Sequence, residues 1–225
     1  MSNHSQKLAE AGLKIKAIKL SPEKPFLWAS GYYMPIYNDN RMFLFYPEYR
    51  KLIMEGFKEL IREFEIDFDV IAGTSTAGIP HGAILAENLN KPFIYIRDKA
   101  KGHGLKNQIE GIDAESDLKH QKVLVIEDLI STGGSSAKAV QAVRDANGMV
   151  DYCLAIFSYG LESALNAFDA LPILCKTHSI LEYNKLLETA KEINYISKNN
   201  MLSLEEWRKS PFTWGEKNDF PKVNK

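Results

Sequence analysis

Cysteine is almost absent from this chain of 225 residues, which contains Cys153 and Cys175 and no others. Each lies within an apolar run, so we expect two buried free thiols in a reducing, cytoplasmic compartment and no disulfide framework. Long apolar runs are also lacking. No stretch reaches the roughly 18 apolar residues of a membrane span, and residues 1–12 lack the apolar core of a signal peptide. The sequence therefore predicts a soluble cytoplasmic protein.

A charge excess of either sign is missing as well, because 28 lysines and arginines stand against 29 aspartates and glutamates, a formal net charge of −1. Binding to nucleic acid or to a membrane surface would therefore need a local basic patch. Two nucleotide-binding signatures are absent too, since the chain has no GxxxxGK[ST] loop and no GxGxxG after a strand-like run. An anionic ligand must be bound by other local devices.

The first third of the chain has clear local patterns. Residues 6–20 space their apolar residues as a loose helix, which we expect to end in a turn at Ser21 and Pro22. Residues 26–40 are rich in aromatic and β-branched residues and are broken by glycine and proline, which predicts short strands. Over residues 47–64 apolar side chains recur every three or four positions, which predicts an amphipathic helix.

The middle of the chain has the texture of an α/β protein. Four short runs, FDVIAG, KPFIYI, KVLVIE and YCLAIF, are rich in β-branched and aromatic residues and are mostly separated by segments of helix length. Such runs are typical of strands buried on both faces, and their alternation with helices predicts a central, mostly parallel sheet flanked by helices. Beyond Ser179 the sequence predicts two helices and then a polar tail after Pro211.

A polar segment of about two dozen residues, 98–121, interrupts this alternation. It is rich in lysine and glycine and has little apolar periodicity. A loop of this length inside a compact domain is usually either disordered or an active-site lid. The composition alone leaves both interpretations open.

The strongest functional signal is VLVIEDLISTGGSSAKAV, from Val123 to Val140: a strand, two adjacent acids, a polar turn with glycines, and a helix. Glu127 and Asp128 would lie at the carboxyl end of the strand, where two carboxylates can accept hydrogen bonds from sugar hydroxyls. The turn and the helix N-terminus offer backbone N–H groups to a phosphate. The whole string thus predicts a ribose-5-phosphate site. The alternative is a purely structural one, in which Ser131 or Thr132 caps the helix and the two acids are simply exposed at the strand end, and it explains each part of the string but not their combination.

This string resembles the phosphoribosyl-pyrophosphate motif of the type I phosphoribosyltransferases. Residues 69–83 resemble the pyrophosphate loop of that family, with Thr74 and Ser75 at the end of a strand. RDKAKGHG, residues 97–104, resembles the lid of orotate phosphoribosyltransferases, whose pattern is Arg, three residues, Lys, one residue, His, Gly. Residues 30–41 resemble the element over the base in the same enzymes. The lid pattern favours a lid over disorder for the long loop.

The resemblance implies a type I phosphoribosyltransferase fold and a role for each matched residue. Residues 1–42 would hold the N-terminal helix and a small hood element over the base site, residues 43–200 the core with a flexible lid at about 98–111, and residues 201–225 a C-terminal helix and tail. Implied as catalytic are Lys101, His103 and Asp128. Implied as binding the donor are Arg97, Lys101, His103, Glu127, Asp128, Leu129, Ile130, Ser131, Thr132, Gly133, Gly134, Ser135, Thr74 and Ser75, and as binding the base Ser131, Ser30 and Gly31.

The implied reaction transfers the 5-phosphoribosyl group from phosphoribosyl pyrophosphate to orotate, giving orotidine 5′-phosphate and pyrophosphate in de novo pyrimidine (UMP) synthesis. The resemblance implies Mg²⁺ on the pyrophosphate without a dedicated protein ligand, and a homodimer whose lids are shared between subunits. Neither nucleic acid nor membrane is implied as a partner.

The chain departs from the pattern of some relatives at Asp98, Tyr33 and Met34, and no arginine follows the run at 152–157. Two alternatives therefore stay open, transfer to uracil or a purine, and a donor-sensing regulator without catalysis.

Overall fold

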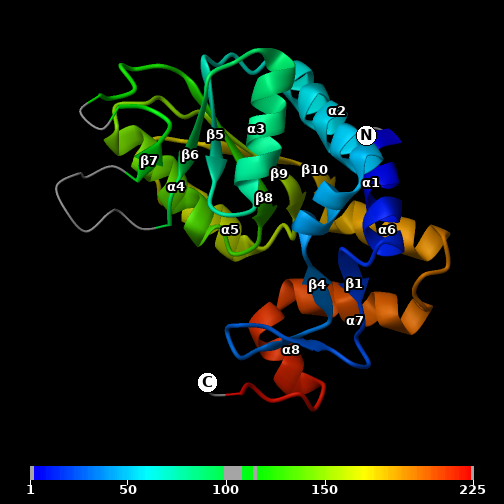
Figure 1. The fold of residues 1–225 in the computed structure, drawn as a ribbon. Coiled ribbons are helices and arrows are strands. Elements are labelled where there is room, and N and C mark those ends of the chain that lie inside the picture. Colours follow the sequence, from blue (N-terminus) through cyan, green and yellow to red (C-terminus); the bar gives the residue numbers. More distant parts are fainter. Residues whose placement is uncertain (1–2, 99–107, 114–115, 224–225) are drawn as a thin grey trace.

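The computed structural model describes residues 3–98, 108–113 and 116–223, and a six-stranded sheet forms its centre (Figure 1). Its order is β10–β9–β8–β5–β6–β7, with neighbours parallel except for β7, which runs antiparallel to β6. The strands are β5 (Val70–Thr74), β6 (Phe93–Ile96), β7 (Ile109–Glu110), β8 (Val123–Ile130), β9 (Tyr152–Ser158) and β10 (Lys176–Glu182). The predicted α/β fold with a central, mostly parallel sheet is confirmed.

Helices cover both faces of this sheet. The described helices, of which α7 and α8 lie below the sheet, are α1 (Asn3–Lys14), the 3-10 helix η1 (Asn40–Phe45), α2 (Pro47–Glu63), α3 (Gly78–Leu89), α4 (Gly134–Asp145), α5 (Glu162–Asp169), α6 (Tyr183–Glu192), α7 (Lys198–Lys209) and α8 (Pro211–Lys217). The amphipathic helix predicted over residues 47–64 corresponds to α2. It begins with a proline, which fits a first helical turn because its missing N–H is not needed there.

Alternate residues of each strand face different helices. Ile71 of β5 and Ile126 of β8 lie in a core cluster that includes residues of α1, α2, α3 and α6. Their neighbours Ala72 and Val125 lie in a second cluster, with residues of α4 and α5. Two buried faces explain why these strands are apolar at consecutive positions.

The N-terminal helix is shorter than predicted. The sequence predicted a helix over residues 6–20, but α1 ends at Lys14 and residues 18–20 form a strand. Lys16 has a left-handed φ of 61°, which stops the helix, and Ile18 is fully buried. The short strands predicted between residues 26 and 40 are confirmed.

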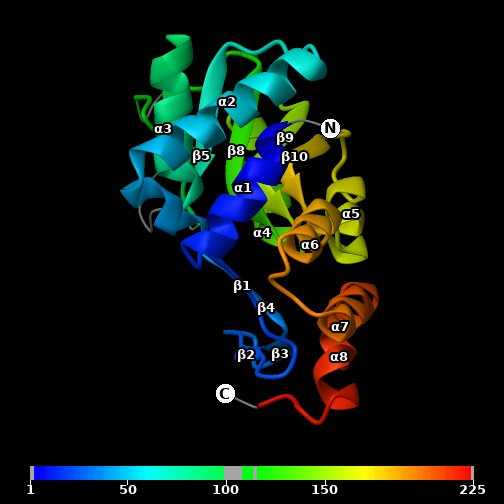
Figure 2. The ribbon, with the colours of Figure 1, turned by 90° about the vertical axis from the view of Figure 1, so that its right-hand side faces the viewer.

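We call strands β1 to β4 the hood. They are β1 (Ile18–Leu20), β2 (Phe26–Leu27), β3 (Tyr33–Met34) and β4 (Ile36–Asn38), and they pair antiparallel as β1 with β4 and β2 with β3. Figures 1 and 2 show the hood below the central sheet, beside α7 and α8. The indole N–H of Trp207 in α7 lies 2.9 Å from the sulfur of Met34 in β3, so chain segments from the two ends meet here.

The C-terminal part differs from the sequence prediction in two places. The sequence predicted helix beyond Ser179, but β10 continues to Glu182 and the helix begins only at Tyr183. The tail after Pro211 is not simply polar, since it forms α8 and buries Trp214 with 2% of its surface exposed. Tertiary packing of that indole decides the structure of a segment whose composition predicts a loop.

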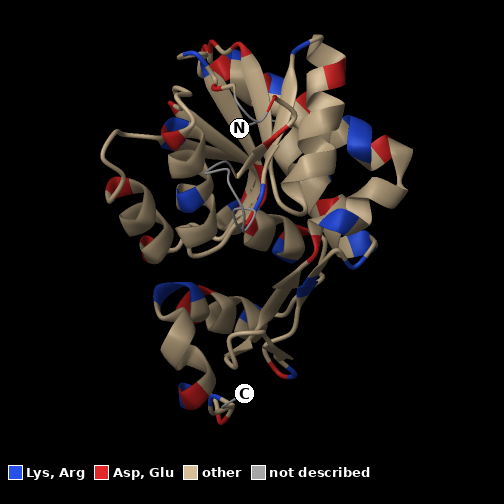
Figure 3. Ribbon diagram, turned by 60° about the vertical axis from the view of Figure 1, so that its left-hand side comes forward, with Lys and Arg blue, Asp and Glu red and all other residues tan. Residues whose placement is uncertain are grey.

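Charged residues of both signs are interspersed over the described part of the molecule (Figure 3). This distribution agrees with the net charge of −1. No helix in the described ranges combines the length and the apolar character that crossing a bilayer would require.

Candidate active site

Strand β8 carries two acids near its carboxyl end, in the interior of the sheet. Glu127 and Asp128 belong to the last four residues of β8, which is flanked by β5 and β9. The chain then turns through residues 131–133 and enters α4 at Gly134. Because ligands of open α/β sheets bind outside the carboxyl ends of the strands, this edge is the candidate site.

Glu127 is held inside the protein, with 7% of its surface exposed. Its Oε1 accepts hydrogen bonds from the Thr74 hydroxyl at 2.7 Å and from the backbone N–H of Asp128 at 3.0 Å. Its Oε2 accepts one from the Ser136 hydroxyl at 2.9 Å. Burial chiefly, and then the negative charge of Asp128, raise the pKa of Glu127 to about 7. The hydroxyl of Thr74, a residue predicted to bind the donor, is thus directed to Glu127.

This raised pKa predicts that stability falls as the pH rises through neutrality. A protonated Glu127 is favoured in the folded state, so its contribution is complete below the ordinary pKa of 4.5 and is lost as the pH passes the folded value of about 7. Between about pH 5 and about pH 8, urea denaturation should show a loss of roughly 2 to 3 kcal/mol in wild type that Glu127→Gln lacks. Equal pH slopes in the two proteins would contradict a raised pKa at this position.

Asp128 is connected to the segment that follows the hood. The side-chain amide of Asn40 donates to the backbone carbonyl of Asp128 at 2.7 Å. Burial raises the pKa of the Asp128 carboxyl, while the hydrogen bond with Glu127 and the positive charge of Arg41 oppose that rise. Arg41 is itself fixed by two hydrogen bonds to the Asp39 carboxylate, at 2.7 and 2.9 Å. The start of η1 therefore supplies a hydrogen bond to the backbone of Asp128 and a positive charge that acts on its carboxylate.

Two cavities flank the acid pair. The first, of about 270 Å³, is lined by Thr74, Ser75, Ile96, Arg97, Asp98, Gln108, Glu127, Ser135, Lys138 and Ala139. The second, of about 460 Å³, is lined by Leu27, Trp28, Ala29, Ser30, Tyr37, Asn38, Leu129, Ser131, Thr132, Tyr159 and Phe212. Glu127 lines the first and Leu129 the second, and Asp128 stands between these two residues in β8. We call the two cavities the polar cavity and the aromatic cavity. A ligand with an anionic group, a sugar and a flat ring fits this order.

The turn between β8 and α4 contributes to both cavities. Ser131 and Thr132 line the aromatic cavity and Ser135 lines the polar cavity. No side chain in the described ranges caps the start of α4, which leaves the N–H groups of its first turn for an anion. Gly133 has φ of 78°, and a Cβ there would lie 2.8 Å from the Cα of Ala164, so both its conformation and its space require glycine.

Two of the residues predicted to bind phosphoribosyl pyrophosphate differ in what they can offer a ligand. The Gly134 backbone is open, since a Cβ there would meet none of the described atoms within 4 Å. Ile130, in contrast, is 3% exposed and pairs with β9 in the sheet, so its side chain belongs to the core. Any contact of Ile130 with a ligand would have to use its backbone.

The predicted lid begins and returns beside the polar cavity. The N–H of Arg97 donates to the carbonyl of Gln108 at 2.8 Å, and both residues line that cavity. The Arg97 guanidinium lies 3.0 Å from the carboxylate of Glu110. The predicted lid residues Lys101 and His103 lie outside the described residues.

The hood loop with Ser30 and Gly31 reaches the aromatic cavity through one of its two predicted base-binding residues. Ser30 lines the cavity and is exposed. Gly31 is buried, with φ of 84°. The backbone of Trp28 pairs with this loop, because its N–H donates to the carbonyl of Tyr32 at 2.9 Å and its carbonyl accepts from the N–H of Gly31 at 2.9 Å.

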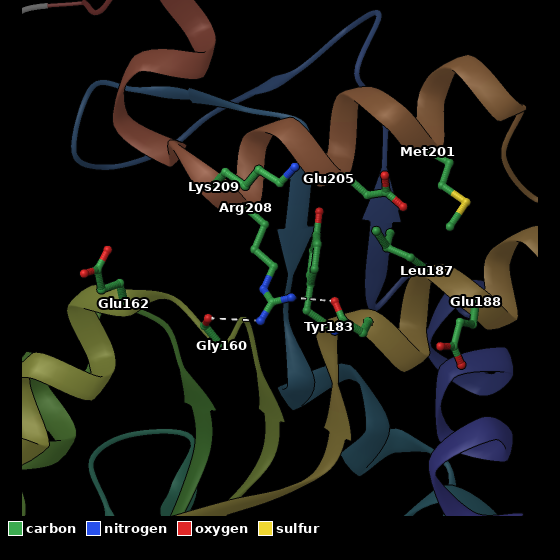
Figure 4. Close-up of a pocket in the computed structure, with 10 residues that line it drawn as sticks. Gly160, Glu162, Tyr183, Leu187, Glu188, Met201, Glu205, Arg208 and Lys209 are labelled. Carbon is green, nitrogen blue, oxygen red and sulfur yellow. Dashed lines mark hydrogen bonds between the residues drawn. The ribbon is translucent and has the colours of Figure 1, made fainter.

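A larger cavity of about 600 Å³ lies between α6 and α7 (Figure 4). Arg208 points from α7 into it and donates to Asn184 at 2.6 Å and to the carbonyl of Gly160 at 3.4 Å. Among the described residues that line it, none belongs to the predicted site and none lines the polar or aromatic cavity. Size alone therefore does not identify the active site.

Sequence reasoning missed several residues that the fold brings to the site. Lys138 lines the polar cavity from the first turns of α4, and its place inside the β8–α4 string was a usable signal. Asn40, Tyr159 and Phe212 are far from that string in sequence. Asn40 lies within residues 30–41, the predicted element over the base, whereas no local pattern marked Tyr159 or Phe212.

Comparison with known proteins shows which family the sequence and the fold resemble. The family model described as phosphoribosyl transferase domain matches residues 44–156. An orotate phosphoribosyltransferase of Cytophaga hutchinsonii is 44% identical over 212 residues, covering 94% of this chain and 99% of that protein. One from Listeria innocua is 46% identical over 211 residues, covering 94% and 98%. The crystal structure of orotate phosphoribosyltransferase from Aeropyrum pernix superposes with a TM-score of 0.69 at 25% identity, covering 84% and 99%.

Proposed function

Since the chain belongs to the phosphoribosyl transferase family, and within it to the orotate phosphoribosyltransferases, we propose that it transfers the 5-phosphoribosyl group of phosphoribosyl pyrophosphate to orotate. The products are orotidine 5′-phosphate and pyrophosphate, in the de novo synthesis of pyrimidine nucleotides (UMP). The observation that carries the proposal is the acid pair near the end of β8, with buried Glu127 lining the polar cavity and half-buried Asp128 preceding Leu129, which lines the aromatic cavity. The shared name of the relatives favours orotate over uracil or a purine, and an enzyme over a regulator.

The ribose would lie across the carboxyl end of β8. Asp128 accepts hydrogen bonds from the ribose hydroxyls, and its negative charge favours the positive charge that develops on the sugar when the bond to pyrophosphate breaks. Glu127 acts from behind, because both of its oxygens already accept hydrogen bonds within the protein. It fixes the start of α4 through Ser136 and the end of β5 through Thr74.

The 5′-phosphate and the pyrophosphate of the donor would bind at two different places beside the β8–α4 turn. The N–H groups and hydroxyls of residues 131–135 bind the 5′-phosphate at the start of α4. The pyrophosphate occupies the polar cavity, where Ser75 follows β5 and where Arg97 and Lys138 supply positive charge. Lys101 and His103 close over it as the negative charge of the leaving group grows, which is the stage at which cations stabilise the reaction most.

Magnesium would neutralise the pyrophosphate. The polar cavity fits this hard cation, since Ser75 and Asp98 in its lining carry the oxygen donors that Mg²⁺ prefers. Within the described ranges, no three or more His, Cys, Asp or Glu side chains cluster in a way that could hold a metal ion. We propose that the ion takes most of its ligands from the pyrophosphate and from water, as is common for Mg²⁺.

Orotate would enter the aromatic cavity, beside the ribose. Trp28 provides flat apolar surface, and the buried ring of Tyr159 supports it with a centroid distance of 5.7 Å. Ser30, Asn38 and Ser131 supply polar groups for the ring oxygens and nitrogens of the base. A mostly apolar cavity with a few fixed polar groups is the usual form of a small-molecule site.

We propose a homodimer in which each lid reaches the active site of the other subunit. Exposed apolar side chains on η1, Phe45 with 83% and Met42 with 36% of their surface exposed, support an interface between copies. The buried free thiols Cys153 and Cys175 support a reducing, cytoplasmic location.

We also propose residues 43–200 as the catalytic core, with residues 1–42 and 201–225 as additions to it. The contact between Met34 and Trp207 supports treating these two additions as one structural unit over the base. The lid would span about residues 98–111.

The test is a direct assay in which the protein is mixed with phosphoribosyl pyrophosphate, Mg²⁺ and orotate, and the reaction is measured as the loss of orotate absorbance. We expect turnover that stops when the metal is chelated with EDTA and returns when Mg²⁺ is added in excess. Uracil, hypoxanthine and guanine serve as parallel substrates, with products separated by chromatography. Turnover of one of these bases in place of orotate, or donor binding without any turnover, would contradict the proposed function.

A further inference from the structure

The C-terminal arm, which we define as residues 211–223, lies along the hood (Figures 1 and 2). A Cβ on Gly215 would lie 3.2 Å from the carbonyl oxygen of Tyr33, so α8 passes close to the backbone of β3. The ring of Phe220 lies 5.8 Å from the ring of Tyr33. The arm thus contacts β3 through both backbone and side chain.

The arm is anchored from its inner side. Trp214 is 2% exposed, its indole N–H donates to the Ser203 hydroxyl in α7 at 3.2 Å, and its ring stacks on Phe220 at 6.4 Å. The amide of Asn218 donates to the carbonyl of Trp214 at 2.8 Å. These contacts fix where the arm turns back toward the hood.

The end of the arm pairs with the loop that was predicted to bind the base. The N–H of Val223 donates to the carbonyl of Gly31 at 2.9 Å. A Cβ on Gly31 would lie 2.2 Å from the carbonyl oxygen of Val223, so no other residue fits at this left-handed position while the arm is in place. The ammonium of Lys222 lies 4.5 Å above the ring of Tyr32. The arm therefore fixes the conformation of the residues next to Ser30.

Phe212 carries the arm into the aromatic cavity. It lines that cavity together with Leu129 of β8 and with Ser131 and Thr132 of the β8–α4 turn. One edge contact holds its ring, at 5.2 Å from the ring of Tyr32, and 40% of its surface remains exposed. A half-exposed aromatic ring in the wall of a cavity is suited to contact a flat ligand.

We propose that the C-terminal arm is one wall of the base site, with Phe212 as a base-binding residue and Val223 as a positioning residue that acts through Gly31. The proposal rests on the proposed function, which places a nucleobase in the aromatic cavity. It assigns specificity for the base to a part of the chain outside residues 44–156, the part matched by the family model. Donor binding, which uses β5, β8 and α4, is expected to be independent of the arm.

The test measures the KM of each substrate separately in point variants of the full chain. Phe212→Ala should raise the KM for orotate about tenfold, because the base loses an aromatic contact, and should leave kcat and the KM for phosphoribosyl pyrophosphate within about twofold. Phe212→Leu keeps apolar bulk, so its KM for orotate should lie between those of wild type and Phe212→Ala. Val223→Pro removes the N–H that binds Gly31, and should raise the KM for orotate about threefold with the same split. The matched control is Leu202→Ala, at a side chain of α7 that is 51% exposed.

A second measurement separates this inference from the proposed function. Isothermal titration calorimetry can measure the binding of orotidine 5′-phosphate to each variant without catalysis. Weaker binding to Phe212→Ala than to wild type would support the inference. Equal affinity, or equal KM values for orotate, would overturn it even if the wild type turns over orotate. If the wild type binds the nucleotide but does not turn over orotate, the proposed reaction is wrong and the affinity comparison still decides the role of the arm.

Discussion

Replacing Asp128 with asparagine should lower kcat/KM for phosphoribosyl pyrophosphate by about a hundredfold to a thousandfold, without unfolding the protein. The substitution keeps the shape of the side chain and the backbone carbonyl that accepts the hydrogen bond of Asn40. It removes the negative charge nearest to the sugar and one acceptor for its hydroxyls. The loss should appear in kcat as well as in donor affinity, because the charge is worth most when the sugar becomes cationic.

The control for this variant is Asp145→Asn. Asp145 is an exposed acid at the end of α4 and accepts a hydrogen bond from Gln141, one turn earlier in the helix. Asp145→Asn makes the same change of charge as Asp128→Asn, but at the end of α4. It should therefore leave kcat and the KM for phosphoribosyl pyrophosphate near their wild-type values. An Asp128→Asn protein with wild-type kcat and a changed thermal midpoint would mean that Asp128 is structural. In that case the ribose would have to be held elsewhere.

Local sequence was sufficient for the centre of the fold and for the acid pair. β5, β8 and β9 were predictable because each buries consecutive residues on both faces of the sheet. Glu127 and Asp128 were predictable because a strand, a glycine-bearing turn and a helix follow one another without interruption, and that order itself places the acids at a ligand-binding edge. Where chemistry and local structure coincide in one string, sequence is a good guide.

Elements at the edges of the fold were not predictable in the same way. The first residues of β10, Lys176–Thr177–His178, are polar and partly exposed, because this strand lies at an edge of the sheet. β7 consists of two residues inside a polar segment. α8 has seven residues, and the burial of Trp214 against α7 decides its conformation. In each case neighbours distant in sequence, not local propensity, select the structure.

The same limit applies to the site. Asn40 reaches the backbone of Asp128 across 88 positions of sequence, and no local pattern marks that contact. Thr74 was expected at the donor, yet its hydroxyl binds the buried carboxylate of Glu127. A sequence string indicates which residues gather at an edge, but not which of them face the ligand and which support those that do.

Lys101→Ala should lower kcat about a thousandfold, because the cation that meets the leaving pyrophosphate is lost while the rest of the site remains. The position of the flanking residues supports this expectation, since Arg97 and Gln108 both line the polar cavity and bring the ends of the segment to it. Lys106→Ala is the matched control. It removes a lysine of the same segment that stands outside the pattern of arginine, lysine and histidine, and it should retain most of the activity.

Mixing two inactive variants then tests whether the lid acts on the active site of its own subunit or on that of the neighbouring subunit. In a hybrid of Lys101→Ala and Asp128→Asn subunits, a lid that acts on the neighbouring subunit leaves one site with both residues intact. A lid that acts on its own subunit leaves both sites defective. After the subunits are exchanged in equal amounts, half of the dimers are hybrids with one intact site of two, so about a quarter of the wild-type activity should return. Activity that stays at the level of the separate variants, with exchange verified by a mass tag on one of them, would show that the lid closes over its own site and that the second subunit has another role.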